Sequence, residues 1–317
     1  MRTPSQTASR GLLADLPVLL VAVVWGSSYL AAKHLATGPT VVAMLVVRFG
    51  LALPLFGLVA WRGLRALSRA EWLGGAVLGV ILAAILLLET FGVVHTSATN
   101  AGLIISLTMV LTPLGESLLA RTAPPRAFLA AAGLSVLGVG LLTQGAGLSA
   151  PSIGDLLVLG AALVRTAHVL AMSRARTVRR TDSLALTWVQ LATATLVFAL
   201  VAPFAGPSPW SLAASYGPAQ WADLLYLTVF CTVLAFLVQM WAVRATSPSR
   251  VSLLLGTEPL WAAVCGIAIG GDHLVPLALL GGLLVLAGTE LGRRAIQPAP
   301  AVTPASDTTP APDPVQA

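Results

Sequence analysis

Hydrophobic side chains occur along the chain in long, nearly uninterrupted runs that are separated by short polar connections. Each run is close to the roughly 20 residues that a helix needs to cross the hydrocarbon core of a bilayer. The runs lack the alternation of period two that strands of a membrane barrel would show. The pattern therefore predicts an all-α polytopic membrane protein with ten transmembrane helices, at about 16–33, 39–61, 72–94, 97–120, 126–145, 154–174, 182–205, 221–243, 248–270 and 275–292.

The composition supports a lipid bilayer as the environment of the chain. Hydrophobic residues make up 57% of the sequence and charged residues only 9%, whereas soluble domains carry about a quarter charged residues. The net charge of +6 does not indicate nucleic-acid binding, because the arginines lie in short connections between the apolar runs.

The arginines also predict the orientation of the chain. Fifteen of them fall in the N-terminal segment, in alternate connections and in the C-terminal tail, whereas the other side has only Lys33. Basic residues gather in the cytoplasm. We therefore expect an inner (plasma) membrane protein with both termini cytoplasmic, an uncleaved first helix after residues 1–15, and a disordered tail at 293–317.

The two halves of the sequence resemble each other. FGVVHTSATNAGL (91–103) aligns with WAVRATSPSRVSL (241–253) at a spacing of 150 residues, and 14–32 aligns with 154–172 at a spacing of 140. Each half, 16–145 and 154–292, contains five expected spans. Because five is odd, the second half must enter the membrane from the opposite side. The result is an inverted repeat, an architecture typical of secondary transporters with a substrate site near the midplane.

Several motifs carry a resemblance to a known family. They are VVWGSSYLAAK (23–33), VRFGLALPL (47–55), ETFGVVHTSATNAGLI (89–104), QMWAVRATSPSRVSLLLGTEPLWA (239–262) and GGDHLVPLALLGGLLVLAG (270–288). In this order they resemble the EamA family of the drug/metabolite transporter (DMT) superfamily. The resemblance implies two inverted five-helix repeats around a central cavity, and transport of small metabolites, often export of amino acids or related solutes.

Ionisable side chains within the apolar runs are candidates for substrate binding or coupling, because charge in hydrocarbon is costly and usually faces a cavity. An arginine could bind a substrate carboxylate, and a glutamate could bind an amine or carry a proton. Alternatively, Arg165 and Glu258, or Arg48 and Glu89, neutralise each other as structural pairs. The candidates with charged side chains are Arg48, Glu89, Arg165 and Glu258. Their opposite signs indicate a zwitterion, such as an amino acid, as cargo.

Three further residues within the apolar runs are candidates. His168 follows Arg165 by three residues on one helix face, and it either couples transport to protons or packs as a hydrogen-bonded histidine. Trp25 and Trp188 align in the repeat with Arg165 and Arg48, so we expect them to line the cavity or to pack between helices. Pro113 and Pro259 predict helix breaks in the fourth and ninth spans.

Sequence signatures of other functions are absent. The chain contains no P-loop, HExxH or GxSxG motif and no metal-ligand spacing, and its two cysteines, Cys231 and Cys265, lie alone in apolar runs. We expect no cofactor, no metal and no enzymatic activity. The predicted function is alternating-access transport of a small polar metabolite, best an amino acid or amine, in the direction of export. The alternatives are a drug-efflux transporter or a non-transporting membrane scaffold or receptor, and the sequence leaves proton coupling and oligomeric state open.

Overall fold

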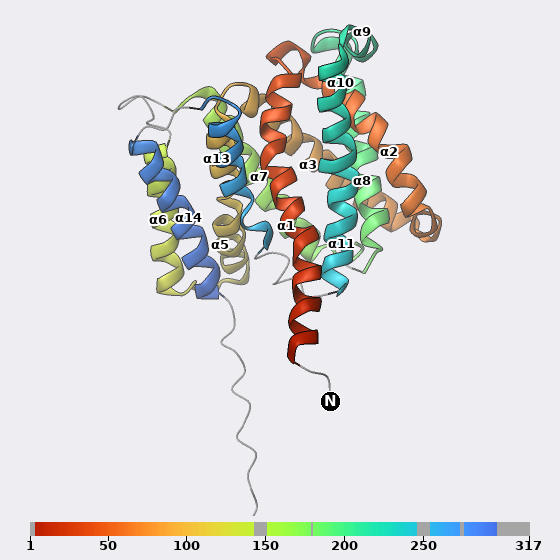
Figure 1. The fold of residues 1–317 in the computed structure, drawn as a ribbon. Coiled ribbons are helices and arrows are strands. Elements are labelled where there is room, and N and C mark those ends of the chain that lie inside the picture. Colours follow the sequence, from red (N-terminus) through yellow and green to blue (C-terminus); the bar gives the residue numbers. More distant parts are fainter. Residues whose placement is uncertain (1–3, 143–150, 179, 246–253, 273–275, 297–317) are drawn as a thin grey trace, which may run out of the picture.

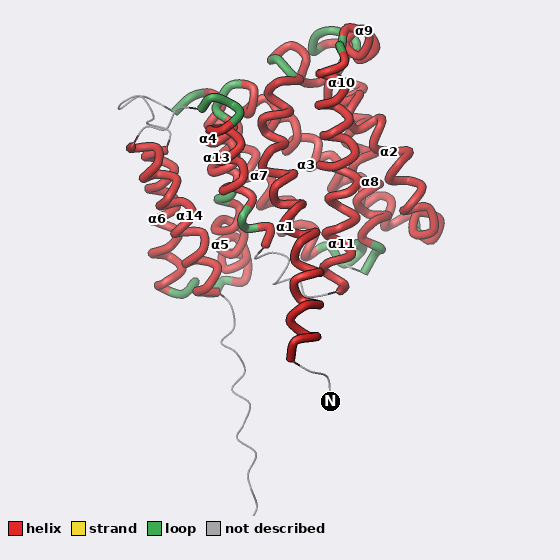
Figure 2. Tube along the Cα trace, viewed as in Figure 1, coloured by secondary structure: helices red, strands yellow, loops and turns green. Residues whose placement is uncertain are grey.

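The computed structural model describes residues 4–142, 151–178, 180–245, 254–272 and 276–296 (Figure 1). Every regular element in these ranges is a helix, as expected, and none of them is a strand (Figure 2). The α-helices are α1 (Pro4–Leu35), α2 (Val41–Ala66), α3 (Arg69–Val94), α4 (Ala98–Ile105), α5 (Thr108–Ala120), α6 (Arg126–Leu142), α7 (Ile153–Arg174), α8 (Ser183–Val201), α9 (Pro209–Ser215), α10 (Pro218–Leu225), α11 (Ala235–Ala245), α13 (Glu258–Ala268) and α14 (Pro276–Ile296).

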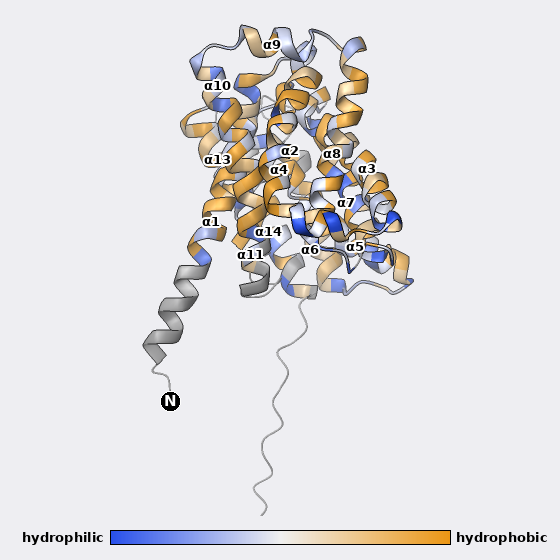
Figure 3. Ribbon diagram, turned by 90° about the vertical axis from the view of Figure 1, so that its right-hand side faces the viewer, coloured by the Kyte–Doolittle hydropathy of each residue, from blue (hydrophilic) through white to orange (hydrophobic). Residues whose placement is uncertain are grey.

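The helices have the length and composition of membrane spans. Seven stretches within the described residues are long and apolar enough to cross a bilayer, and three shorter apolar helices lie at Arg126–Gly138, Glu258–Ala268 and Leu279–Gly292. Hydrophobic residues cover most of the helix surfaces, and hydrophilic residues gather toward the helix ends (Figure 3). The chain is therefore a multi-pass membrane protein.

Each helix packs against specific neighbouring helices. α1 packs against α13, α2 against α8, and α3 against both α7 and α8. α6 and α14 form a closely packed pair at one edge of the molecule (Figure 1). The helices that carry the seven candidate site residues, α1, α2, α3, α7, α8 and α13, are thus not part of this pair.

Two of the apolar stretches, those containing α5 and α13, are interrupted at matching positions. Between α4 and α5, helical structure gives way to a turn at Ser106–Leu107, where the Leu107 N–H donates to the Ile104 carbonyl at 3.1 Å. Directly before α13, the Thr257 N–H donates to the Leu254 carbonyl at 3.2 Å. These two bonds are related by the spacing of 150 residues found in the sequence. α5 and α13 therefore begin at corresponding residues, Thr108 and Glu258.

These turns change the predicted positions of the helix breaks. Pro259 lies in the first turn of α13, where a missing N–H removes no intrahelical hydrogen bond. Pro113 lies inside α5, and that helix continues to Ala120, because membrane helices tolerate a proline where neighbouring groups satisfy the freed carbonyl. The interruption in the second half directly precedes Pro259, close to the predicted break, whereas Pro113 does not itself interrupt α5 and the turn lies N-terminal to that helix.

A π-helical segment, Tyr226–Leu234, lies between α10 and α11. Its Thr232 hydroxyl donates to the carbonyl of Leu227, five residues earlier, at 2.9 Å. π-helical turns are uncommon and occur frequently at functional sites. This segment faces α2, where it meets Arg48.

Glycine substitutions on α6 test how closely α6 and α14 pack. A Cβ atom on Gly138 would lie 2.6 Å from the Val285 backbone nitrogen, whereas one on Gly133 of the same helix would meet nothing within 4 Å. We expect Gly138→Ala to lower the free energy of unfolding by roughly 1–3 kcal/mol through overpacking. Gly133→Ala should be neutral or stabilising by up to about 1 kcal/mol, because alanine is the better helix former.

The measurement is the thermal unfolding midpoint of both variants in detergent, followed by the fraction of monodisperse protein. Equal midpoints for Gly133→Ala and Gly138→Ala would contradict the close approach of α6 and α14.

Candidate functional site

A cavity of about 500 Å³ lies in the main body of the fold, between α1, α2, α3, α7, α8, the π-helical segment, α11 and the start of α13. Its volume falls in the range of roughly 300–1,000 Å³ that is usual for small-molecule sites. Six of the seven residues that the sequence singles out as site candidates line it: Trp25, Arg48, Glu89, Arg165, His168 and Glu258.

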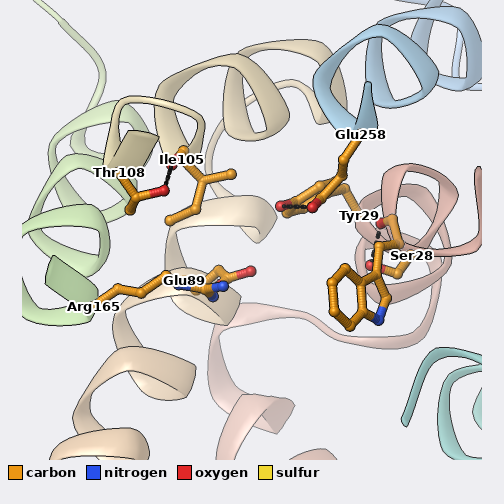
Figure 4. Close-up of polar contacts among 8 residues, drawn as sticks. Ser28, Tyr29, Glu89, Ile105, Thr108, Arg165 and Glu258 are labelled. Atoms are coloured by element: carbon orange, nitrogen blue, oxygen red, sulfur yellow. Dashed lines mark hydrogen bonds and ion pairs between the residues drawn. The ribbon is translucent and has the colours of Figure 1, made fainter. Parts of the chain in front are cut away.

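An ion pair between α7 and α3 crosses one side of the cavity. Arg165 Nη2 donates to Glu89 Oε2 (Figure 4). This pairing differs from both of the structural pairs that the sequence offered as an alternative to substrate binding, Arg165 with Glu258 and Arg48 with Glu89. Its cause is the close packing of α3 on α7, where a Cβ atom on Gly92 would lie 3.0 Å from the Val158 backbone nitrogen. The carboxylate on α3 therefore faces the guanidinium on α7.

Glu258 has a neutral partner instead. Its Oε1 accepts a hydrogen bond of 2.9 Å from the hydroxyl of Tyr29 on α1. Figure 4 shows these two side chains meeting apart from Arg165 and Glu89. Glu258 forms no ion pair within the described residues. Because it is the first residue of α13, the helix dipole favours its negative charge.

Arg48 likewise lacks an acidic partner within the described ranges. Its Nη2 donates to the Thr232 hydroxyl at 3.3 Å, and its Cζ lies 4.9 Å from the centroid of the Phe49 ring. Its Nε is buried without a hydrogen-bond partner in the structure. Buried polar atoms are rarely left unpaired, so this guanidinium has unused capacity to donate to a ligand.

The π-helical segment supplies polar groups on the same side as Arg48. Trp25 donates its indole N–H to the carbonyl of Cys231 at 2.9 Å, and the Thr228 hydroxyl donates to the carbonyl of Arg48 at 3.4 Å. Thr232 and Tyr29 are cavity residues that the sequence did not single out. Hydroxyl side chains are common within apolar spans. These two could be recognised as partners of charged groups only once the helix packed against each of them was known.

His168 contacts α8 within the cavity wall. Its Nε2 lies 2.7 Å from Oε1 of Gln190, and both side chains are buried. This contact supplies a hydrogen-bond partner of the kind expected for a packing histidine. A role in proton coupling stays a prediction.

Trp188 does not line the cavity. Its indole N–H donates to the carbonyl of Leu53 at 2.9 Å, and its ring lines a separate groove between α2, α3 and α8. Of the two alternatives that the sequence left open, Trp25 lines the cavity, whereas Trp188 packs between helices. The repeat alignment matches Trp25 with Arg165 and Trp188 with Arg48, but it does not fix which neighbouring helix each side chain faces.

A second polar network lies at the opposite end of the helices from the arginine-rich connections. Lys33 Nζ donates to the carbonyl of Thr96 at 2.8 Å, and the Thr96 hydroxyl donates to Asp155 Oδ1 at 2.5 Å. Asn100 donates to the same oxygen at 3.3 Å, and the Ser152 N–H donates to Asp155 Oδ2 at 3.0 Å. Asp155, only 4% exposed, thus ties α7 to the start of α4.

Comparison with known proteins identifies the family. The sequence profile of the EamA-like transporter family matches residues 12–144 and 152–291. Two Archaeoglobus fulgidus proteins named as uncharacterized transporters are each 28% identical to the chain. One matches over 275 residues, covering 87% of this chain and 84% of the relative, and the other over 288 residues, covering 87% and 96%.

A solved crystal structure is similar in fold. It has a TM-score of 0.58 and 18% sequence identity, and the match covers 88% of this chain and 95% of that one. The family match spans both halves of the chain and agrees with its apolar, all-helical fold. The chain is therefore a membrane transporter that belongs to the EamA-like transporter family of the DMT superfamily.

Proposed function

We propose that the chain is a secondary transporter of a small zwitterionic metabolite, with an amino acid as the best candidate. The observation that supports this proposal is which of the charged side chains in the cavity have an ion-pair partner. Glu89 and Arg165 neutralise each other, whereas Arg48 and Glu258 line the same cavity without an ion-pair partner among the described residues. A ligand with one charge of each sign would complement both.

The contacts of the two side chains suggest their roles. The Arg48 guanidinium, with its unpartnered Nε, can donate two parallel hydrogen bonds to a substrate carboxylate. Glu258, held by the Tyr29 hydroxyl, can accept a hydrogen bond from the substrate ammonium. Glu89 and Arg165 provide a second pair that can open to exchange partners during transport.

The proposed mechanism is alternating access of two inverted five-helix repeats, 16–145 and 154–292, that together make ten spans. Two observations support it. The family profile matches the chain in two successive stretches, and the turns before α5 and α13 occur at the same spacing as the sequence repeat. Such discontinuous helices are typical of transporter sites. We place both termini in the cytoplasm and favour export across the inner membrane.

A drug-efflux function is the second candidate, because aromatic side chains also line the cavity. Trp25 packs edge-on against Phe236, with ring centroids 6.0 Å apart, and Phe49 lies beside Arg48. An aromatic wall of this kind would suit a planar apolar cation. The charged groups on the same surface favour the zwitterion.

Uptake into proteoliposomes tests the proposal. The purified protein is assayed with one amino acid and with two analogues of it, the decarboxylated amine and the deaminated acid, each of which retains one of the two charged groups. An uncharged polyol and a planar aromatic cation are assayed beside them. Protein-free liposomes are the control, and each assay is repeated with an imposed pH gradient to detect proton coupling. We expect the zwitterion to be taken up fastest. Uptake of the polyol without the zwitterion would refute the proposal, and uptake of the aromatic cation alone would support drug efflux.

A further inference from the structure

A groove of about 710 Å³ lies on the outside of the fold, separate from the central cavity. It runs between the C-terminal half of α2, the start of α3 and the start of α8. Leu58 on its rim is 80% exposed and Trp61 is 58% exposed, so the groove opens to the surroundings of the protein. α2 lies at the right-hand edge of the view in Figure 1. In a bilayer, this surface faces lipid.

The wall of the groove is held in place by specific contacts. The Trp188 indole N–H donates to the carbonyl of Leu53 at 2.9 Å. A Cβ atom on Gly57 would lie 2.9 Å from Trp188 Nε1, so glycine there allows the ring to reach α2. Trp72 packs edge-on against Trp188, with ring centroids 6.3 Å apart and an interplanar angle of 85°. The groove is therefore preformed, with an aromatic wall built from α3 and α8.

One end of this apolar groove carries a positive charge. Among the described residues that line it, Arg65 alone is charged, and its Cζ lies 5.6 Å from the centroid of the Trp61 ring. Arg62 and Arg69 lie at the same end of the helices. Glu71, the acid nearby in sequence, already accepts hydrogen bonds from Ser68 and Thr181.

The Arg65 side chain has capacity for a ligand. Within the described residues it forms no hydrogen bond or ion pair, and its guanidinium stacks on the Trp61 ring. A guanidinium stacked on an aromatic face keeps the N–H groups at its edge free, and these match the oxygens of a phosphate. Tryptophan and arginine at a helix end are also typical of the level of lipid headgroups.

We propose that this groove binds an anionic phospholipid. One acyl chain lies against Leu53, Leu58 and the tryptophan wall, and the headgroup phosphate accepts hydrogen bonds from Arg65. An apolar groove within the spans must be filled by acyl chains, and the basic end selects lipids with net negative charge. The site is distinct from the transport cavity, so the inference does not depend on the identity of the cargo.

Native mass spectrometry of the full-length protein in detergent tests the site. Phosphatidylglycerol and phosphatidylcholine with identical acyl chains are titrated separately. We expect phosphatidylglycerol to bind more tightly, and Arg65→Gln to weaken its binding about fivefold, the effect of one basic residue at an anionic surface. Arg65→Lys should retain most of the preference.

The matched control is Arg126→Gln, which removes the same charge at the start of α6, on the other side of the molecule from α2 (Figure 1). It should leave the preference unchanged. Excess inorganic phosphate should not displace the lipid, because the acyl chain contributes to binding. Equal binding of the two lipids by wild type, equal losses in Arg65→Gln and Arg126→Gln, or displacement by free phosphate would each overturn the proposal.

Discussion

Replacing Arg48 by glutamine is expected to slow the uptake of a zwitterionic substrate by roughly 10- to 100-fold at subsaturating concentration. Hydrogen bonds to charged groups contribute about 1.5–3 kcal/mol each, and the substitution removes the guanidinium that we propose to bind the substrate carboxylate. The side chain forms no ion pair with a described acid. Its loss therefore leaves no carboxylate unpaired in the described part of the protein, and folding should be preserved.

The comparison with Glu258→Gln makes the prediction specific. The uptake of three related solutes is measured for both variants: an amino acid, its decarboxylated amine and its deaminated acid. Arg48→Gln should lose uptake of the amino acid and the acid but keep that of the amine. Glu258→Gln should lose uptake of the amino acid and the amine but keep that of the acid. Normal transport by both variants, or equal losses on all three solutes, would show that these side chains do not bind the two ends of the cargo.

The sequence predicts the helical, membrane-spanning character of the chain because that property depends only on local composition. Runs of about 20 apolar residues must be helices in a bilayer, where unsatisfied backbone groups are too costly. The same reasoning marks Arg48, Glu89, Arg165 and Glu258 as side chains that need a cavity or a partner. The structure places all four on one cavity.

The partners of these residues could not be predicted from the sequence. Position along a span gives the depth of a residue in the membrane, but it does not give the neighbour that its helix face meets. Arg165 pairs with Glu89 because α7 packs on α3, and Trp188 faces α2 because Gly57 makes room for its ring. Both outcomes depend on contacts between helices far apart in the sequence.

The interruptions of the helices were only partly predictable. The prolines indicate which spans are irregular, but the turns lie before them, at Ser106–Leu107 and at Thr257. The π-helical segment Tyr226–Leu234 contains neither proline nor glycine, so nothing local distinguishes it from an α-helix. It is stabilised by tertiary contacts such as that between Trp25 and the Cys231 carbonyl.

The ion pair between Glu89 and Arg165 gives the largest expected effect on stability. Removal of one partner of a buried ion pair typically costs 3–5 kcal/mol, because the remaining charge is left uncompensated. The Arg165 side chain is 39% exposed to the cavity, so water reduces this penalty. We expect Glu89→Gln and Arg165→Gln each to lower the free energy of unfolding by about 2–3 kcal/mol.

The double variant Glu89→Gln/Arg165→Gln should recover much of this loss, because it leaves neither charge without its partner. The measurement is unfolding in detergent for all four members of the double-mutant cycle. Arg294→Gln serves as control, because it breaks an exposed pair with Glu290 on α14 and should cost less than about 1 kcal/mol. Additive losses in the double variant, or single variants as stable as wild type, would show that the pair does not stabilise the packing of α3 on α7. The Glu89–Arg165 pair would then be free to separate and to take part directly in binding the cargo.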